Sequence, residues 1–285
     1  MHITKPIIKT KKPDNWGTKA DQCEYYIDKF THENQLKMSD SKHIMIVPIC
    51  DPHFGNTGVR MKLAGDHAKL IGKTENCYAF LAGDATDNFV NMKIVSAMVN
   101  KNSSPVEERQ LLDEYLGFFN NHVLLAISGN HEEWSKALAG IDLFRDLYKK
   151  HQIFYGQSCF YVELTCGKNL YRIYLRHKYR FNSSINQTHT VKQMLRMDDV
   201  DFDIGIVAHN HEAAFELFLW KKLTRLAIRG GSYKVADAYG RQMGFNQAVP
   251  IMPSFICRAD HRAILPFENI EEGVDYLNFL NRRTK

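Results

Sequence analysis

The sequence predicts an α/β fold in which two β-sheets face each other and helices cover their outer sides. In the first half of the chain, apolar runs at 43–50, 77–82 and 122–128 are each followed by a helical pattern, which indicates strand–helix units. From residue 158 onward, aromatic and β-branched residues alternate around short turns, which is typical of β-hairpins with one buried face. A chain of 285 residues is long enough to bury such a core.

The first half of the chain also supplies most of the helices. Helices are expected at 62–71, 88–100, 105–119 and 135–151. The helix at 105–119 has the clearest beginning, because Ser104 can cap it and Pro105 suits the first helical position. Glu107 stands three residues after the cap and completes a capping box. The start of this helix is therefore predicted to the residue.

The second half of the chain supplies hairpins and one further buried strand. Runs at 160–165 and 170–175 flank the turn Cys166-Gly-Lys-Asn169 and predict the first hairpin. The remaining elements are a helix at 188–197, a strand at 202–208, a hairpin of 215–220 and 223–228, and late strands at 254–258 and 262–265. No internal repeat or low-complexity tract interrupts this order.

Residues 1–41 are interpreted as an N-terminal extension ahead of the main domain, which is expected to span residues 42–285. The extension is polar and basic, and it contains the run Lys9-Thr-Lys-Lys-Pro13. A short amphipathic helix is expected at 21–30. The extension is therefore expected either to pack on the domain or to form a flexible arm.

The composition is that of an ordinary soluble globular protein, with 44% hydrophobic and 24% charged residues. No apolar run is long enough to cross a bilayer, so we expect a cytoplasmic protein without a membrane partner. The six cysteines are scattered without a CxxC pair, which favours buried thiols in a reducing compartment. A net charge of +5 permits an anionic substrate.

Polar residues follow the predicted strands at the points where the strands end. They are Asp51, His53, Asp84, Asp87, Asn130, His131, Glu132, His177, His209 and His211. Open α/β folds build their sites at the carboxyl ends of strands, so these side chains are expected to lie close together. Carboxylate oxygens, an amide oxygen and imidazoles together suit a pair of divalent metal ions.

The blocks Asp51-x-His53, Gly83-Asp84-x-x-Asp87, Gly129-Asn130-His131-Glu132, His177 and His209-x-His211 resemble, in this order, the motifs of the calcineurin-like metallophosphoesterase superfamily. The resemblance covers residues 51–211. Two positions depart from the usual pattern, because Ala208 stands where the family usually has glycine and Glu132 stands where aspartate is also common. Neither departure removes a ligand.

The resemblance implies a four-layer α/β/β/α sandwich with two divalent metal ions. It implies one ion held by Asp51, His53 and His211, a second held by Asn130, His177 and His209, and Asp84 bridging both. His189 is an alternative to His177, which is favoured because it directly follows an apolar strand. Manganese is the favoured metal, and iron and zinc are alternatives, because mixed oxygen and nitrogen ligands do not separate them.

The resemblance also implies a reaction. A water between the two ions would be acidified, and the resulting metal-bridging hydroxide would attack phosphorus in line with the leaving oxygen. His131 would protonate the leaving group or stabilise charge on the phosphoryl oxygens. Asp87 is similar to the family's carboxylate that orients this histidine.

The basic segment 176–182 supplies candidate substrate-binding residues. They are Lys178, Arg180 and Asn182. These side chains either hold phosphate oxygens or form a solvated basic loop. Arg229 and Tyr233 either line the cleft or belong to a hairpin turn, and the turn is favoured. Trp134 is predicted to be a packing residue.

The sequence thus predicts a dinuclear metal-dependent phosphodiesterase that acts on DNA, RNA or a nucleotide, and it leaves protein partners open. DNA-repair nucleases of the SbcD type share the motifs, and the basic segment 176–182 favours such a diester. The alternatives are a nucleotide pyrophosphohydrolase, a phosphomonoesterase for a small substrate, and a non-catalytic scaffold, which the complete ligand set disfavours. A protein serine/threonine phosphatase is disfavoured, because such enzymes generally carry arginines where this chain has Asn88 and Ser128.

Overall fold

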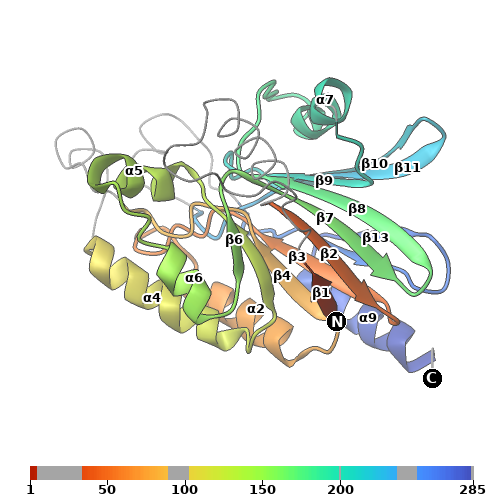
Figure 1. Ribbon diagram of the computed structural model, residues 1–285, viewed down its shortest axis with the longest axis horizontal. Coiled ribbons are helices and arrows are strands. Elements are labelled where there is room, and N and C mark those ends of the chain that lie inside the picture. Colours follow the sequence, from red (N-terminus) through yellow and green to blue (C-terminus); the bar gives the residue numbers. More distant parts are fainter. Residues whose placement is uncertain (5–33, 89–102, 199, 236–248, 284–285) are drawn as a thin grey trace, which may run out of the picture.

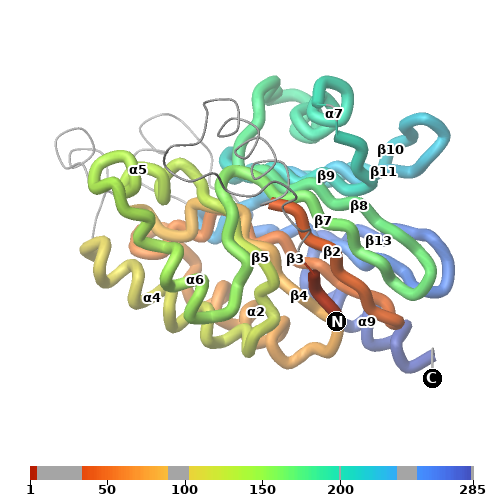
Figure 2. Tube along the Cα trace, viewed as in Figure 1, coloured from red at the N-terminus to blue at the C-terminus, as the bar shows by residue number. Residues whose placement is uncertain are grey.

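The computed structural model describes residues 1–4, 34–88, 103–198, 200–235 and 249–283. In this part of the chain, two β-sheets pack face to face and helices cover their outer faces (Figure 1). The chain alternates strands and helices first and adds the hairpins later (Figure 2). The predicted α/β fold with two mixed sheets is confirmed.

Within the described residues, one sheet has six strands in the order β13-β12-β3-β4-β5-β6. Their bounds are β3 Ile44–Ile49, β4 Cys77–Leu81, β5 Val123–Ile127, β6 Phe154–Gly156, β12 Ser254–Cys257 and β13 Ile264–Phe267. Strands β3 to β6 are parallel, and β12 and β13 pair antiparallel with their neighbours. The carboxyl ends of β3, β4 and β5 therefore meet at one edge of this sheet.

The second sheet has seven strands within the described residues, in the order β1-β2-β7-β8-β9-β11-β10. Their bounds are β1 His2–Thr4, β2 Gln35–Asp40, β7 Cys159–Cys166, β8 Asn169–Arg176, β9 Ile204–Val207, β10 Ala214–Trp220 and β11 Leu223–Arg229. Strands β8, β9 and β11 are parallel neighbours, so their carboxyl ends also lie together.

Helices complete the outer layers. Their bounds are α2 Met61–Lys73, α4 Pro105–Phe118, α5 Asn130–Ala139, α6 Arg145–Lys150, α7 His189–Met197 and α9 Ile270–Arg283. Helices α2, α4, α6 and α9 pack on the six-stranded sheet, and α7 packs on the seven-stranded sheet. Helix α4 begins as predicted, because Ser104 and Glu107 form the capping box.

Alternation along β3 explains why the sheets pack together. Met45, Val47 and Ile49 point to the helices, while Ile44 and Ile46 point into the core between the two sheets. Successive side chains of a strand face opposite sides of the sheet, so a strand that is apolar at every position is buried on both faces. Together with the core under α7, this arrangement gives the four predicted layers.

Two expected boundaries differ from the structure. Strands β1 and β2 belong to the seven-stranded sheet, so residues 2–4 and 35–40 are part of the fold although they precede the boundary expected after residue 41. The helix expected at 135–151 is two helices, because α5 already starts at Asn130 and ends before Gly140, whose φ of 67° is left-handed. The helix expected at 21–30 and residues 89–100 of the helix expected at 88–100 lie outside the described residues.

The cysteines in the described part of the chain are free thiols. Four of them, Cys50, Cys77, Cys166 and Cys257, are buried, which agrees with the expected buried thiols. In the same ranges of residues, no helix combines the length and the apolar character needed to span a bilayer.

Candidate metal centre

The polar residues predicted at the strand ends come together at one edge of the sandwich. Strands β3, β4 and β5 of the six-stranded sheet end there, and β8 and β9 of the seven-stranded sheet end opposite them. In the described residues, their His and Asp side chains form three overlapping groups whose nitrogen and oxygen atoms lie within 4.8 Å of one another in each group. The two sheets therefore share a single cluster of possible metal ligands.

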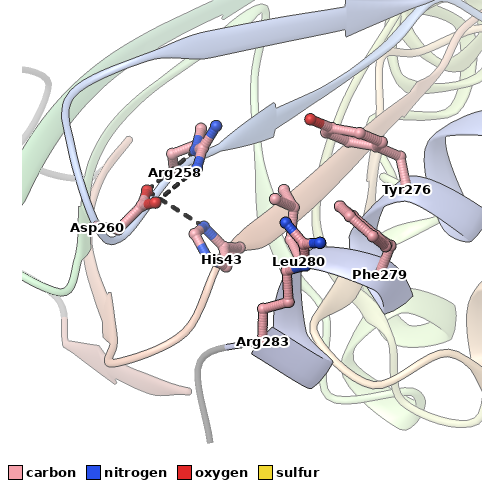
Figure 3. Close-up of a pocket in the computed structure, with 7 residues that line it drawn as sticks. All are labelled: His43, Arg258, Asp260, Tyr276, Phe279, Leu280 and Arg283. Carbon is pink, nitrogen blue, oxygen red and sulfur yellow. Dashed lines mark hydrogen bonds and ion pairs between the residues drawn. The ribbon is translucent and has the colours of Figure 1, made fainter.

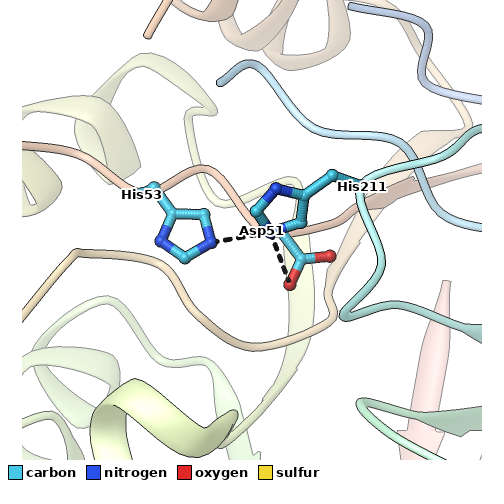
Figure 4. Close-up of side chains that lie close together, drawn as sticks. All are labelled: Asp51, His53 and His211. Carbon is cyan, nitrogen blue, oxygen red and sulfur yellow. Dashed lines mark hydrogen bonds and ion pairs between the residues drawn. The ribbon is translucent and has the colours of Figure 1, made fainter. Parts of the chain in front are cut away.

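Asp51, His53 and His211 form the first group, and Figure 4 shows their side chains turned toward one another. Nε2 of His53 lies 2.9 Å from Nε2 of His211. The same His211 nitrogen lies 4.0 Å from Oδ1 of Asp51. These are the three residues predicted to hold the first ion.

Asp84, His177 and His209 form the second group. Nε2 of His177 lies 3.3 Å from Oδ2 of Asp84 and 3.0 Å from Oδ1 of Asn130. Nδ1 of His177 lies 2.8 Å from the backbone oxygen of Ala82 and can only donate to it, which directs Nε2 toward the cluster. The structure thus brings together the residues predicted around the second ion.

Asp84 lies between the groups, because it also forms a third group with His53 and His131. Its Oδ2 atom lies 3.8 Å from Nε2 of His131, and its Oδ1 atom accepts a hydrogen bond of 2.9 Å from the backbone N–H of His131. This N–H belongs to the first turn of α5, where the helix dipole favours a negative charge. Asp84 therefore has the position expected of a bridging carboxylate.

The chemistry of these donor atoms fits two divalent cations. Among the described residues, Oδ1 of Asp51 and Nδ1 of His209 are buried without a hydrogen-bond partner, and such atoms call for an explanation such as an ion. Burial lowers the pKa of His209 to about 4, which leaves a neutral imidazole able to bind a metal. Burial opposes a charge on His177, but Asp84 and Asp51 raise its pKa to about 9, so the cluster favours a positive charge there.

The backbone at the predicted ligands is strained. Asp51, His53, Asp84, His209 and His211 all have positive φ angles, between 45° and 75°. Residues other than glycine rarely adopt this left-handed conformation, and such strain concentrates at functional sites. The strain is explained if these loops are shaped to aim ligands at the centre of the cluster.

Glu132 holds the loops of two neighbouring strands together. Its carboxylate accepts hydrogen bonds from the backbone N–H groups of Asp84, Ala85 and Gly129, at 2.9, 2.8 and 2.7 Å. Burial raises its pKa to about 7, and the backbone donors act against that rise. The sequence presented Glu132 only as a motif residue, whereas the structure shows that it fixes the position of Asp84.

Two glycines of the motifs allow the loops to approach closely. A Cβ atom at Gly129 would lie 2.1 Å from Oδ1 of Asp84. A Cβ atom at Gly83 would lie 2.7 Å from Nδ1 of His177, and the φ of Gly83 is 89°. Any side chain at either position would displace a predicted ligand.

Asp87 makes a different contact from the one predicted. Its carboxylate was expected to orient His131, but Oδ1 lies 2.9 Å from Nδ1 of His53, and Oδ2 accepts a hydrogen bond of 2.8 Å from Asn56. The backbone oxygen of Asp87, rather than its side chain, accepts a hydrogen bond of 2.5 Å from Nδ1 of His131. Asp87 thus contacts His53 through its side chain and His131 through its backbone oxygen, and a sequence pattern does not show which of the two groups meets which histidine.

His131 is held from several sides. The bond to the backbone of Asp87 places its proton on Nδ1 when the ring is neutral, so Nε2 faces Asp84. The ring of Trp134 packs against it with centroids 4.1 Å apart, and the side chain of Asn88 donates to its backbone oxygen at 2.6 Å. Burial lowers the pKa of His131 to about 4. In the sequence, Asn88 was noted only because protein serine/threonine phosphatases generally have an arginine at this position.

The three predicted substrate-binding residues follow β8 in one loop. Lys178, Arg180 and Asn182 are all exposed. Oδ1 of Asn182 accepts a hydrogen bond of 2.9 Å from Nη2 of Arg229. The alternative ligand His189 is at the start of α7, where its Nε2 contacts Gln193 at 3.3 Å, and it belongs to none of the three groups.

The structure places Arg229 closer to the candidate site than the sequence indicated. A hairpin turn was favoured at this position, but Arg229 is the last residue of β11 and pairs with Val207 of β9, two residues before His209. Its side chain is only 3% exposed, and its Nη1 atom has no hydrogen-bond partner among the described residues. Its place beside the strand that carries His209 could have been inferred only from the strand pairing.

Figure 3 shows a pocket of about 400 Å³ whose lining residues belong to none of the three groups. It is lined by residues that include His43, Arg258 and Tyr276. The neighbouring Cys257 pairs with Ile44, the first residue of β3, whereas Asp51 lies two residues beyond the other end of that strand. In this pocket Arg258 is paired with Asp260, and the guanidinium carbon of Arg283 lies 4.4 Å from the ring centroid of Phe279.

No protein-family model matches the chain, and no curated protein matches it. Among solved structures, it is similar to the calcineurin-like phosphoesterase YfkN from Bacillus subtilis, with 12% identity, 86% of this chain and 98% of that chain covered, and a TM-score of 0.43. A metallophosphoesterase from Sphaerobacter thermophilus has 12% identity, 83% and 94% coverage and a TM-score of 0.38. A phosphatase from Mycoplasma pneumoniae has 12% identity, 79% and 92% coverage and a TM-score of 0.38. Similarities at this level assign no activity to the chain, so the proposal for its function depends on the site.

Proposed function

We propose that the protein is a metal-dependent phosphodiesterase of the calcineurin-like type, with two divalent ions and a DNA, RNA or nucleotide substrate. The observation that carries the proposal is the arrangement of Asp84 between two groups of donor atoms, one with Asp51, His53 and His211 and the other with His177 and His209. Bound ions of this kind supply Lewis acidity and acidify water for attack on phosphorus. Manganese is the proposed metal, with iron and zinc as alternatives.

The residues of the chain divide the remaining work. Asp84 is proposed to bridge the ions, and Asn130 is proposed to complete the second set of ligands. His131 binds no ion in this scheme, and its Nε2 atom faces the cluster from the first turn of α5. Because Nδ1 of the neutral ring already donates to Asp87, Nε2 carries a proton only in the cationic ring, which burial disfavours before substrate is bound. In that cationic form, the Nε2 proton can be transferred to the leaving oxygen or can stabilise charge on a phosphoryl oxygen.

The substrate class is proposed from the loop that follows His177. Lys178 and Arg180 are exposed cations on this loop, and Asn182 joins it to Arg229. Exposed cations beside a phosphoryl site favour a substrate that continues as a chain of phosphates over a lone phosphate group. We therefore favour a nuclease-like diesterase over a hydrolase of small nucleotides.

The test compares ester types with the protein loaded with Mn²⁺. Bis-p-nitrophenyl phosphate and a short labelled DNA should be hydrolysed, and the monoester p-nitrophenyl phosphate should be a poor substrate. Replacing Lys178 and Arg180 by alanine should weaken DNA binding for all sequences and lower the salt dependence of log affinity by about one for each lost contact.

The matched control is the double replacement of Lys221 and Lys222 by alanine. These exposed lysines lie in the turn between β10 and β11, so the variant loses the same charge at another place and should keep the salt dependence. Rapid hydrolysis of mononucleotides or dinucleotides with DNA untouched would overturn the nuclease proposal and leave the metal site standing.

A further inference from the structure

Building on the proposed function, we propose that Tyr179, Arg180 and Phe181 form a platform beside the metal centre on which an unpaired nucleobase of the substrate stacks. The platform would make the protein select single-stranded nucleic acid. Its place in the chain is close to the cluster, because Tyr179 is two residues beyond His177.

The platform is a ladder of alternating cations and aromatic rings. The guanidinium carbon of Arg176 lies 5.3 Å from the ring centroid of Tyr179, and that of Arg180 lies 5.8 Å from the same ring. The Arg180 carbon also lies 4.9 Å from the ring centroid of Phe181. All three separations are within the range of cation–π attraction. Phe181 ends the ladder, and 41% of its surface is exposed.

The inner part of the ladder is fixed to the fold. The hydroxyl of Tyr179 donates a hydrogen bond of 2.6 Å to Asp198, whose other oxygen lies 3.4 Å from Arg176. Behind the loop, the backbone oxygen of Phe181 accepts a hydrogen bond of 3.0 Å from Thr190 of α7. Phe181 is therefore held at its backbone, and its ring remains at the surface.

The conformation of Phe181 supports a binding role. Its φ angle is 67°, which is unfavourable for a bulky residue, and its large apolar ring is exposed. Neither feature improves the stability of the free protein, whereas both are useful if the ring must face a ligand. Exposed rings and arginines in a basic loop are the means by which proteins bind the bases of single strands without reading their sequence.

The next residue links the platform to the metal centre. Asn182 accepts a hydrogen bond from Arg229, which is buried at the end of β11 beside the strand that delivers His209. A base on Phe181 and a phosphate at the cluster would thus be held by two parts of one connected structure.

The test measures binding of a hydrolysis-resistant phosphorothioate oligothymidylate and of an abasic oligonucleotide of equal length to the Mn²⁺-loaded protein. Phe181→Ala should weaken binding of the oligothymidylate about 5- to 100-fold and leave binding of the abasic strand unchanged. Phe181→Trp should restore binding, and its fluorescence should change on adding the oligothymidylate. Deoxythymidine monophosphate, tested in parallel, shows whether one nucleotide suffices or a strand is needed.

The matched control is Phe118→Ala on α4. Phe118 is 43% exposed and has the ammonium group of Lys69 4.7 Å from its ring centroid, so it repeats the local features of Phe181 outside the loop. This variant should bind both strands as the unchanged protein does. Equal weakening of both strands by Phe181→Ala, or no weakening of either, would overturn the platform.

Failure of the platform and failure of the proposed function give different results. If Phe181→Ala leaves binding of the oligothymidylate unchanged while DNA and bis-p-nitrophenyl phosphate are hydrolysed, the platform is refuted and the phosphodiesterase stands. If base-dependent binding is lost in Phe181→Ala but the unchanged protein hydrolyses no phosphoester with Mn²⁺, the platform stands and the proposed activity is refuted.

Discussion

Oδ1 of Asp87 lies 2.9 Å from Nδ1 of His53, and both side chains are buried. A carboxylate at this distance makes Nδ1 the donor and leaves Nε2 of His53 free to face a metal. The backbone oxygen of the same residue accepts a hydrogen bond of 2.5 Å from Nδ1 of His131. Asp87 therefore positions a predicted ligand with its side chain and the predicted acid with its backbone.

Asp87→Asn should weaken metal binding more than it disturbs His131. An asparagine keeps one acceptor oxygen but turns an amide donor toward either His53 or Asn56, so His53 loses its fixed orientation. Affinity for one of the two ions should fall about 10- to 100-fold, as measured by Mn²⁺ titration calorimetry. Asp113→Asn, which changes a carboxylate bonded to His151 outside the site, is the control. Unchanged Mn²⁺ affinity with reduced turnover would show that the side chain acts on His131 after all.

Asp84→Ala should lose both ions and nearly all turnover, because one carboxylate is shared by two groups of donor atoms. Metal content after dialysis, measured by mass spectrometry, checks the prediction. Asp66→Ala removes an exposed carboxylate paired with Lys62 and should retain both ions. Two ions still bound to the Asp84 variant would contradict the bridging role.

His131→Ala should retain both ions and lose turnover about 10²- to 10⁴-fold, the range expected of general acid catalysis. His189→Ala is a useful companion, because His189 lies outside the three groups and should keep both metal and turnover. Loss of metal in the first variant would make His131 a ligand. Loss of metal in the second would restore His189 as the alternative to His177.

Gly129→Ala should destabilise the protein by about 1–3 kcal/mol, because its Cβ atom would lie 2.1 Å from Oδ1 of Asp84 and the loops must move apart. Urea denaturation gives the free energy of unfolding, and metal content should fall as well. A Cβ atom at Gly117 in α4 would have no other atom within 4 Å, so Gly117→Ala should stabilise the helix by about 0.5–1 kcal/mol. A neutral effect at Gly129 would show that the loops are not tightly packed.

Glu132→Gln should also lower stability, by about 1–3 kcal/mol, because the carboxylate accepts from three backbone N–H groups and an amide can offer only one oxygen. Thermal unfolding measured beside Glu133→Gln separates this effect from a general loss of charge, since Glu133 is partly exposed. Equal unfolding temperatures in the two variants would count against the role of Glu132 in joining the loops.

The sequence predicted the members of the cluster well because parallel strands place their carboxyl ends together. Apolar runs marked the ends of β3, β4 and β5, and Asp51, Asp84 and Asn130 each stand two or three residues beyond those ends. His177 was also found because β8 ends directly before it. These features depend on residues close in the chain, where pattern and geometry are linked.

The contacts between loops could not be predicted in the same way. Whether the carboxylate of Asp87 meets His53 or His131 depends on loop paths that periodicity does not describe. The strand β2 was assigned to an extension because its partner β7 lies more than a hundred residues later, and no local pattern shows that pairing. Arg229 was missed for the same reason, since its importance comes from the strand beside it.

The origin of the ligands in both sheets has a mechanical consequence. Asp51 and His53 lie in the loop after β3 of the six-stranded sheet, and His211 lies in the loop after β9 of the seven-stranded sheet, so an ion held by all three would link the two layers at one edge. Removing the ions with a chelator should allow the two sheets to separate locally at this edge. Amide hydrogen exchange should then become faster at the carboxyl ends of β3 and β9. The opposite edge, where β12 joins β13, would keep its protection. The ions would then stabilise the contact between the two sheets at one edge of the sandwich.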